Sequence, residues 1–253
     1  MIYDEFPDLY DAQYQSYRDD LPFYLRLADD VGQPVLELGA GTGRVTEALA
    51  RAGNAVVALD ASAAMLARAR RRLEAAGVDG RVELLEADMR ALDLGRRFPL
   101  VIAPFNTLMH AYSLDDQDRT LKGVRQHVEP GGVFAFDLYV PRLGQLGVLR
   151  SEPSLPGAEP ASAAGGGRTD LFLVQHDDPD RQLLSSTYYR DAVAQDGTLK
   201  RTVTTLRQRY FTRFELERAL RSAGFALSLH GGFDRSRFDK ASHHMVGVAR
   251  PMA

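Results

Sequence analysis

The chain has no cysteine among its 253 residues, which excludes disulfide bonds, thiolate metal ligands and a cysteine nucleophile. It also lacks any run of about 18 apolar residues, so we expect no membrane-spanning helix. The formal net charge of −3 argues against a nucleic-acid substrate. The six histidines show no spacing typical of metal ligands, so we expect no metal site.

The N-terminus lacks the features of a signal peptide. Residues 1–7 (MIYDEFP) are acidic and contain no basic region followed by an apolar stretch, so we expect a cytoplasmic protein. A hydrophobic content of 45% is enough for an ordinary globular core. The sequence leaves the oligomeric state open, with a homodimer as one option.

The most informative segment is VLELGAGTGRV, residues 35–45. An apolar run that carries Glu37 leads into three glycines at alternate positions, Gly39, Gly41 and Gly43, and then into a helical pattern. This order predicts a strand that feeds a tight turn, where glycine permits a positive φ or the close approach of a ligand.

Two further apolar strands end in acidic residues. Residues 55–59 lead into Asp60, and residues 82–85 lead into Glu86 and Asp88. Because the carboxyl ends of parallel strands meet at one edge of a sheet, we expect these carboxylates to lie beside the glycine turn, where such folds bind ligands. A carboxylate at Asp60 could accept both hydroxyls of a ribose there.

The alternation of strand and helix patterns predicts parallel βαβ units. The expected strands span residues 34–38, 55–60, 81–86, 99–104 and 132–138, and the helices between them span residues 43–52, 62–76 and 115–128. Two helices precede this alternation, at residues 7–17 and from Asp20 onward, and a helix at 212–223 follows it with final strands at 225–229 and 245–249.

An insertion separates the fifth strand from the last helix. Residues 151–168 are rich in proline, alanine, serine and glycine, which predicts a mobile loop. Three β-like segments follow at 170–176, 183–194 and 199–211, and Asp196-Gly197 between the last two is a hairpin signal. We expect an antiparallel meander that caps a substrate site.

These motifs resemble those of the class I S-adenosylmethionine-dependent methyltransferases, and the resemblance extends from Val35 to about Val140. The matching elements occur in the order and at the spacing of that family. They are residues 37–43 (ELGAGTG) for the first motif, Asp60-Ala61-Ser62 with Met65 for the second, residues 86–89 (EADM) for the third, residues 98–107 at the position of the fourth, and residues 129–137 (EPGGVFAFD) for the turn and strand after the fourth helix.

The resemblance implies an α/β fold, with a Rossmann-like, seven-stranded, mostly parallel sheet, helices on both faces and the antiparallel cap inserted after the fifth strand. Residues 1–142 and 212–253 would form the cofactor-binding core, with residues 1–30 as lid helices. Residues 143–211 would form the loop and the cap over the substrate site.

The resemblance also implies S-adenosylmethionine as the cofactor. Its binding residues would lie at the carboxyl ends of the strands and on the N-terminal lid: Tyr10, Glu37, Gly39, Ala40, Gly41, Gly43, Asp60, Ala61, Met65, Asp88, Met89 and Phe105. Among these, Glu37 and Gly39 would hold the amino-acid end, Asp60 the ribose and Asp88 the adenine amine. The two methionines would form the apolar walls around the adenine.

Three residues are the predicted catalytic groups: Tyr14, Asn106 and His110. Tyr10 and Tyr14 lie four residues apart and share a helix face, so they either pack on the core or cover the cofactor. Similar N-termini occur in small-molecule N-methyltransferases of the glycine/sarcosine and amino-sugar types. Asn106 and His110 follow the fourth strand, where the reacting methyl group should lie, although His110 is equally explained as a hydrogen-bonded structural histidine.

The interpretation that fits best is methyl transfer to a small-molecule acceptor, with an amine nitrogen preferred. Oxygen and carbon acceptors, a nicotinamide oxidoreductase and a non-enzymatic adenosylmethionine-binding module are the alternatives. The dinucleotide fingerprint GxGxxG requires glycine where this chain has Arg44, which argues against the oxidoreductase. Residues 104–107 (PFNT) differ from the Asn/Asp-Pro-Pro-aromatic motif of DNA and glutamine methyltransferases.

Overall fold

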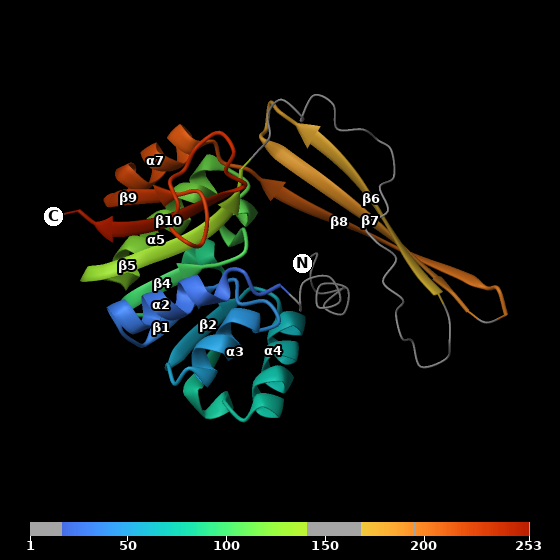
Figure 1. Ribbon diagram of the computed structural model, residues 1–253, viewed down its shortest axis with the longest axis horizontal. Helices are drawn as coiled ribbons and strands as arrows, with labels where there is room; N and C mark the ends of the chain where they lie inside the picture. Colours follow the sequence, from blue (N-terminus) through green and yellow to red (C-terminus); the bar gives the residue numbers. More distant parts are fainter. Residues whose placement is uncertain (1–16, 141–167, 195, 253) are drawn as a thin grey trace. The chain divides into compact units, whose positions relative to one another are not determined.

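The computed structural model describes residues 17–140, 168–194 and 196–252 (Figure 1). The chain divides into two compact units. We call the unit that ends at Val140 and resumes at Phe211 the core unit, and the unit from Pro141 to Tyr210 the β unit. Among the described residues, no helix has the length and apolar character needed to cross a membrane.

The core unit is built on a seven-stranded sheet of order β3-β2-β1-β4-β5-β10-β9, which confirms the predicted architecture. Its strands are β1 (Val35–Leu38), β2 (Val56–Asp60), β3 (Val82–Glu86), β4 (Phe98–Ala103), β5 (Val128–Tyr139), β9 (Phe225–His230) and β10 (His244–Pro251). The first five strands run parallel, and β10 pairs antiparallel with both β5 and β9. The predicted antiparallel pair at one edge is therefore confirmed.

Helices cover both faces of this sheet. They are α2 (Leu21–Val31), α3 (Arg44–Arg51), α4 (Ala63–Ala76), α5 (Leu114–His127) and α7 (Arg213–Ser222), with short 3-10 turns η2 (Asp79–Arg81), η3 (Met89–Ala91) and η4 (Thr107–His110). Figure 1 shows α2 and α3 on one face and α5 and α7 on the other. Such coverage explains why β1 is buried at every residue, as parallel strands between two helical layers are.

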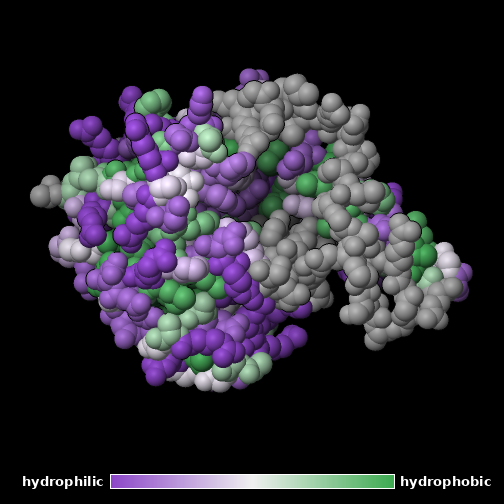
Figure 2. All heavy atoms as spheres, in the orientation of Figure 1, coloured by the Kyte–Doolittle hydropathy of each residue, from purple (hydrophilic) through white to green (hydrophobic). Residues whose placement is uncertain are grey.

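The core lies between the sheet and α2 with α3. Phe23, Tyr24 and Leu27 of α2 pack with Val35 and Leu100 of the sheet, and all five are at most 2% exposed. A fully buried apolar side chain of this size contributes about 1.5–3 kcal/mol. Figure 2 shows that the visible face of the core unit carries mostly hydrophilic residues, with apolar residues in small separate groups.

The helix boundaries follow the signals in the sequence. The Ser62 hydroxyl accepts a hydrogen bond from the Met65 backbone N–H at the start of α4, and Gly77 ends that helix in the left-handed region. Thr212 forms a capping box with Glu215 at the start of α7. The predicted helices at 62–76 and 212–223 are thus confirmed.

The β unit contains a three-stranded antiparallel sheet of order β6-β7-β8. Its strands are β6 (Arg168–Asp178), β7 (Leu183–Val193) and β8 (Leu199–Arg209). Gly197 has φ +83° between β7 and β8, where the sequence predicted a hairpin. The predicted loop at 151–168 lies outside the described residues except for Arg168, which begins β6. The capping role of this unit stays a prediction.

Candidate functional site

The glycine turn after β1 has the predicted backbone. Gly39, Gly41 and Gly43 have φ values of +64°, +57° and +80°. A Cβ on Gly39 would lie 2.7 Å from the side chain of Thr107, and a Cβ on Gly43 would lie 3.0 Å from the Cβ of Ala69 on α4. A Cβ would therefore overlap Thr107 at Gly39 and make a tight contact at Gly43, and the positive φ favours glycine at all three positions.

Asp60 ties the end of β2 to the glycine turn. Its Oδ2 accepts a hydrogen bond from the Gly41 backbone N–H at 2.8 Å, and its Oδ1 accepts one from the Ser62 N–H at 2.8 Å. The carboxylate therefore lies at the sheet edge where the ribose site was expected. Its contact with a ribose stays a prediction.

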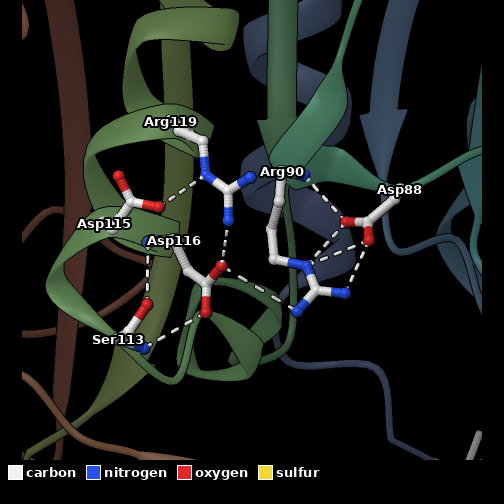
Figure 3. Close-up of polar contacts among 6 residues, drawn as sticks. All are labelled: Asp88, Arg90, Ser113, Asp115, Asp116 and Arg119. Atoms are coloured by element: carbon white, nitrogen blue, oxygen red, sulfur yellow. Dashed lines mark hydrogen bonds and ion pairs between the residues drawn. The ribbon is translucent and has the colours of Figure 1, made fainter.

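Asp88 lies next to the end of β3 and is bound by Arg90 (Figure 3). Its Oδ1 accepts from the Arg90 backbone N–H and Nε, both at 2.9 Å, and its Oδ2 accepts from Arg90 Nε at 3.0 Å and Nη2 at 2.6 Å. The hydrogen bonds from Arg90 lower the pKa of Asp88 below its usual range. Since each carboxylate oxygen has two lone pairs, the predicted adenine amine would have to displace one of these Arg90 donors.

The Arg90 guanidinium extends from Asp88 toward the start of α5 (Figure 3). Its Nη1 lies 4.0 Å from Asp116 Oδ1, and the same oxygen pairs with Arg119 at 2.7 Å. Asp116 also completes a capping box with Ser113. The predicted adenine edge is thus connected to the N-terminus of α5 through Arg90.

Glu37 lies inside the protein beneath the glycine turn. It is 2% exposed, and its Oε2 accepts a hydrogen bond from the Thr46 hydroxyl of α3 at 2.6 Å. Burial raises the pKa of Glu37 to about 8, while the Thr46 hydrogen bond acts in the opposite direction. A nearby cationic ligand would favour the ionised form.

Arg44, at the start of α3, holds the segment that precedes α2. Its Nη1 and Nη2 donate to the two oxygens of Asp20 at 2.7 and 2.6 Å, and Nη1 also donates to the Tyr17 carbonyl at 3.2 Å. The side chains of Arg44 and Asp20 are 9% and 0% exposed. The guanidinium carbon lies 5.3 Å from the ring centre of Tyr17 and 5.5 Å from that of Phe105.

The turn after β4 has two consecutive left-handed residues. Phe105 and Asn106 have φ values of +54° and +63°. Asp137 of β5 binds both: its Oδ1 accepts from the Phe105 N–H at 2.8 Å, and its carbonyl accepts from the Asn106 N–H at 3.1 Å. The Asn106 Oδ1 accepts from the Tyr139 N–H at 2.7 Å, so this predicted substrate-facing side chain also fastens the turn to β5.

Asp137 is 3% exposed and takes a third hydrogen bond, from the Tyr24 hydroxyl at 2.6 Å. Burial raises the pKa of Asp137 to about 6, although the bonds from Tyr24 and Phe105 act to lower it. Burial and the charge of Asp137 also raise the pKa of Tyr24, which therefore keeps its proton and donates.

His110 is the last residue of η4, and burial lowers its pKa to about 4. Its Nδ1 lies 3.2 Å from the Tyr112 hydroxyl. The imidazole is therefore neutral at neutral pH and can hydrogen-bond a substrate group. Both its catalytic and its structural interpretation stay predictions.

The other predicted site residues lie beside the strand ends, apart from two that lie outside the described residues. Met65 and Met89 are buried at 2% and 9% exposure, beside the ends of β2 and β3, as apolar walls would be. The Ala40 N–H donates to the Leu59 carbonyl, and the Gly43 N–H donates to the Ala40 carbonyl. Ala61 lies between Asp60 and the cap of α4, and Tyr10 and Tyr14 lie outside the described residues.

Five residues of this edge are not among the predicted site residues: Tyr17, Asp20, Tyr24, Arg44 and Asp137. Tyr17 follows Tyr14 by three residues, so Tyr10, Tyr14 and Tyr17 have the i, i+4, i+7 spacing of one helix face, which was an available signal. Asp137 is a lone carboxylate within the apolar run VFAFDL, which was a second signal. Nothing local indicated the partners of Asp20 and Tyr24, because these contacts join distant parts of the chain.

Buried carboxylates outnumber buried cations at this edge. Among the described residues there, Asp20, Glu37 and Asp137 are at most 3% exposed, and Arg44 is the one cation buried with them. A ligand that carries positive charge beside Glu37 would favour the ionised form of this carboxyl group, which burial otherwise disfavours. The ammonium and sulfonium groups of S-adenosylmethionine therefore suit the residues present.

Comparisons with known proteins agree with this geometry. The sequence profile of the family described as "Methyltransferase domain" matches residues 35–132. Over 153 residues, the chain is 38% identical to the cypemycin N-terminal methyltransferase of a Streptomyces species, covering 57% of this chain and 61% of that protein. The chain thus spans less than two thirds of the length of that relative.

Two other relatives match over more of their length. The chain is 28% identical over 235 residues to the dTDP-3-amino-3,6-dideoxy-alpha-D-glucopyranose N,N-dimethyltransferase of Streptomyces fradiae, covering 90% of this chain and 86% of that protein. The solved structure of the CcbJ methyltransferase from Streptomyces caelestis superposes with a TM-score of 0.79 at 29% identity, covering 100% of this chain and 95% of that chain. Residues 35–132 therefore match a methyltransferase domain, and the chain is similar to methyltransferases in sequence and fold over most of its length, as its motifs predicted.

Proposed function

We propose that this enzyme transfers a methyl group from S-adenosylmethionine to an amine nitrogen of a small molecule. The observation that carries the proposal is the excess of buried carboxylates, Asp20, Glu37 and Asp137, around Arg44 at the carboxyl edge of the sheet. This environment favours a cationic cofactor and an amine over an anionic substrate. The relatives reported above, the cypemycin N-terminal methyltransferase and an amino-sugar N,N-dimethyltransferase, support the choice of nitrogen.

The residues that would hold the cofactor come from the ends of three strands, β1, β2 and β3. Glu37 and the glycine turn would bind its amino-acid end, Asp60 its ribose, and Asp88 with Met89 its adenine. When bound, S-adenosylmethionine supplies a methyl group that is activated by the sulfonium charge for in-line displacement by a lone pair. The chain itself then needs to bind, to orient and to exclude water.

Asn106 and His110 are the groups proposed to face the acceptor, and Phe105 is proposed to contact the cofactor. The rings of Tyr17 and Phe105 lie 5.4 Å apart and form an apolar wall at this edge. The neutral His110 would accept a hydrogen bond from the amine and so orient its lone pair. With a pKa of about 4, its conjugate acid does not keep a proton at neutral pH, so the proton released after methyl transfer passes to solvent.

A turnover assay tests the proposal. We expect the purified chain to form adenosylhomocysteine from S-adenosylmethionine when it is given a nucleotide-linked amino sugar or a peptide with a free N-terminal amine. Mass spectrometry should find one or two added methyl groups on the nitrogen. The matched hydroxy sugar and the N-terminally dimethylated peptide serve as controls and should not react.

The alternatives give different results in the same assay. Methylation of the hydroxy sugar would identify an oxygen acceptor. Tight binding of the cofactor without turnover on any amine would favour a non-enzymatic module. An increase in the fluorescence of added NADH, without binding of adenosylhomocysteine, would indicate an oxidoreductase.

A further inference from the structure

The turn after β4 holds Phe105 in a backbone conformation that this residue does not prefer, next to Asn106 in the same region. Phe105 and Asn106 are both left-handed, at φ +54° and +63°, and neither is glycine. Side chains with a Cβ disfavour this region, so two such residues in succession persist only where surrounding contacts determine them. The contacts that do so therefore decide where these two side chains lie.

Asp137 supplies two of those contacts. Its Oδ1 accepts from the Phe105 N–H at 2.8 Å, and its backbone carbonyl accepts from the Asn106 N–H at 3.1 Å. The side-chain contact to Phe105 is removable by mutation, whereas the backbone contact to Asn106 is not. The contribution of the Asp137 carboxylate to holding the turn can therefore be tested by substitution.

The same oxygen is itself oriented by α2. The Tyr24 hydroxyl donates to Asp137 Oδ1 at 2.6 Å, and both side chains are buried, at 0% and 3% exposure. Oδ1 thus joins three elements: α2, β5 and the turn after β4. The position of Oδ1 is therefore set by two donors of the protein itself, the Tyr24 hydroxyl and the Phe105 N–H.

The turn after β4 also sets the position of the Phe105 ring at the edge of the site. The Phe105 ring lies 5.4 Å from the Tyr17 ring and 5.5 Å from the Arg44 guanidinium carbon. Thr107, which directly follows the turn, occupies the space that a Cβ on Gly39 would take. A shift of the turn would therefore reach both the aromatic wall and the glycine turn.

From these contacts we infer that Asp137 is a positioning residue for methyl transfer, which acts through the Phe105 N–H to hold Phe105 and Asn106 at the ligand edge. This inference rests on the proposed function, because Phe105 and Asn106 are the groups assigned there to cofactor and acceptor. It assigns no contact between Asp137 and either ligand.

Two substitutions separate the hydrogen bonds of Asp137 from its charge. Asp137→Asn keeps an Oδ1 that can accept from both Tyr24 and Phe105, whereas Asp137→Leu keeps the size and removes both acceptors. In Asp137→Leu, hydrogen–deuterium exchange at the Phe105 amide should become at least about tenfold faster, because a buried donor loses its partner. Asp137→Asn should stay within about threefold of the wild type, because its acceptor remains.

Binding of adenosylhomocysteine, measured by calorimetry, should follow the same order. We expect the affinity for adenosylhomocysteine to fall about tenfold or more in Asp137→Leu, because a hydrogen bond is lost and the contact of Phe105 with the ligand is displaced. The affinity of Asp137→Asn should stay close to that of the wild type. Leu216→Ala in α7 is the matched control, because Leu216 is fully buried and lies in the helix between β8 and β9. It should lower the melting temperature without changing this affinity.

Tyr24→Phe keeps the inference testable if Asp137→Leu does not fold. It removes only the donor that orients Oδ1, so we expect faster exchange at Phe105 and weaker adenosylhomocysteine binding, each by a smaller factor than in Asp137→Leu. Unchanged exchange and affinity in either variant would overturn the inference. So would Asp137→Asn behaving like Asp137→Leu, or faster exchange with unchanged affinity. A wild-type chain that does not bind adenosylhomocysteine would contradict the proposed function instead, and the exchange rate would still show whether Asp137 holds the turn.

Discussion

At the scale of single residues, burial changes the chemistry of the carboxylates more than the sequence indicates. Glu37 stands in the first motif as an acid, yet burial raises its pKa to about 8. Without a ligand it is therefore largely protonated at neutral pH. The same residue ionises more readily once a cation lies beside it.

This shift predicts how the stability of the ligand-free protein depends on pH. Between the unfolded pKa of about 4.5 and the folded pKa of about 8, the native state holds a proton that the unfolded state has released. The contribution of Glu37 to the free energy of unfolding is therefore highest below this window. It is lost as pH rises through the window, with a slope of at most about 1.4 kcal/mol per pH unit.

Glu37→Gln tests this expectation, because the amide keeps an acceptor for Thr46 and does not titrate. We would measure the free energy of unfolding of wild type and variant in urea at several pH values. As pH rises from 5 to 8, the wild type should lose stability relative to the variant by several kcal/mol in total, which is roughly what one titrating group contributes over this range. The titration of Asp137 is present in both proteins and cancels. A difference that stays constant over this range would show that Glu37 is ionised in the folded protein.

At the scale of elements, the sequence predicted what periodicity and glycine placement determine. The glycine turn, the caps of α4 and α7 and the hairpin between β7 and β8 are all local, so a short window of sequence contains their cause. The first strand could be recognised because β1 is buried at every residue. The start of the fifth strand was predicted less accurately. Glu129-Pro130-Gly131 favoured a turn there, with the strand beginning at residue 132.

The strand β5 instead begins at Val128. Val128 pairs with Phe98, and a register shift between Phe98 and Leu100 accommodates the residues that follow. Gly132 fits there because a Cβ would lie 2.7 Å from the Pro99 carbonyl. Such an irregular pairing depends on the neighbouring strand, and the sequence of one strand does not contain it.

The contacts of the site that sequence reasoning missed are of the same non-local kind. Tyr24 and Asp137 are 113 residues apart in the chain. Neither Phe105 nor Asn106 is a glycine, so the sequence of this turn provided no glycine signal for its left-handed backbone. Arg44 could be recognised only as a departure from a dinucleotide motif, whereas its partner Asp20 comes from the segment before α2.

The Arg44–Asp20 pair predicts how the segment before α2 is attached to α3. Asp20→Ala would leave a buried guanidinium without its carboxylate, which costs about 3–5 kcal/mol of unfolding free energy. The partly exposed pair of Arg51 and Glu47 on α3 is the matched comparison, with the two side chains 56% and 26% exposed. Glu47→Ala should cost less than about 1 kcal/mol, as surface pairs do.

Urea unfolding of both variants decides between these magnitudes. A loss of similar size in Asp20→Ala and Glu47→Ala would mean that the buried pair does not anchor the segment. A large loss in Asp20→Ala alone would support the anchoring role. It would also explain how Tyr17 is kept beside Phe105 at the ligand edge.

At the scale of the whole molecule, the seven-stranded sheet and the separate three-stranded sheet were both anticipated from the alternation of patterns along the chain. The family resemblance supplied the direction of the last strand pair. The acceptor could not be read in the same way, because it depends on groups outside the shared motifs. The predicted capping role of the β unit and the N-terminal tyrosines belongs to this untested part.

The central claim is that a sulfonium-bearing adenosine cofactor binds at the carboxyl edge of β1, β2 and β3. Calorimetric titration of adenosylhomocysteine into the wild type, Asp60→Ala and the exposed-helix control Glu74→Ala tests it most directly. We expect saturable binding to the wild type and the control, and a loss of about 1–3 kcal/mol in Asp60→Ala because a charged acceptor is removed. Absence of saturable binding to the folded wild type, or equal affinity in Asp60→Ala, would contradict the claim.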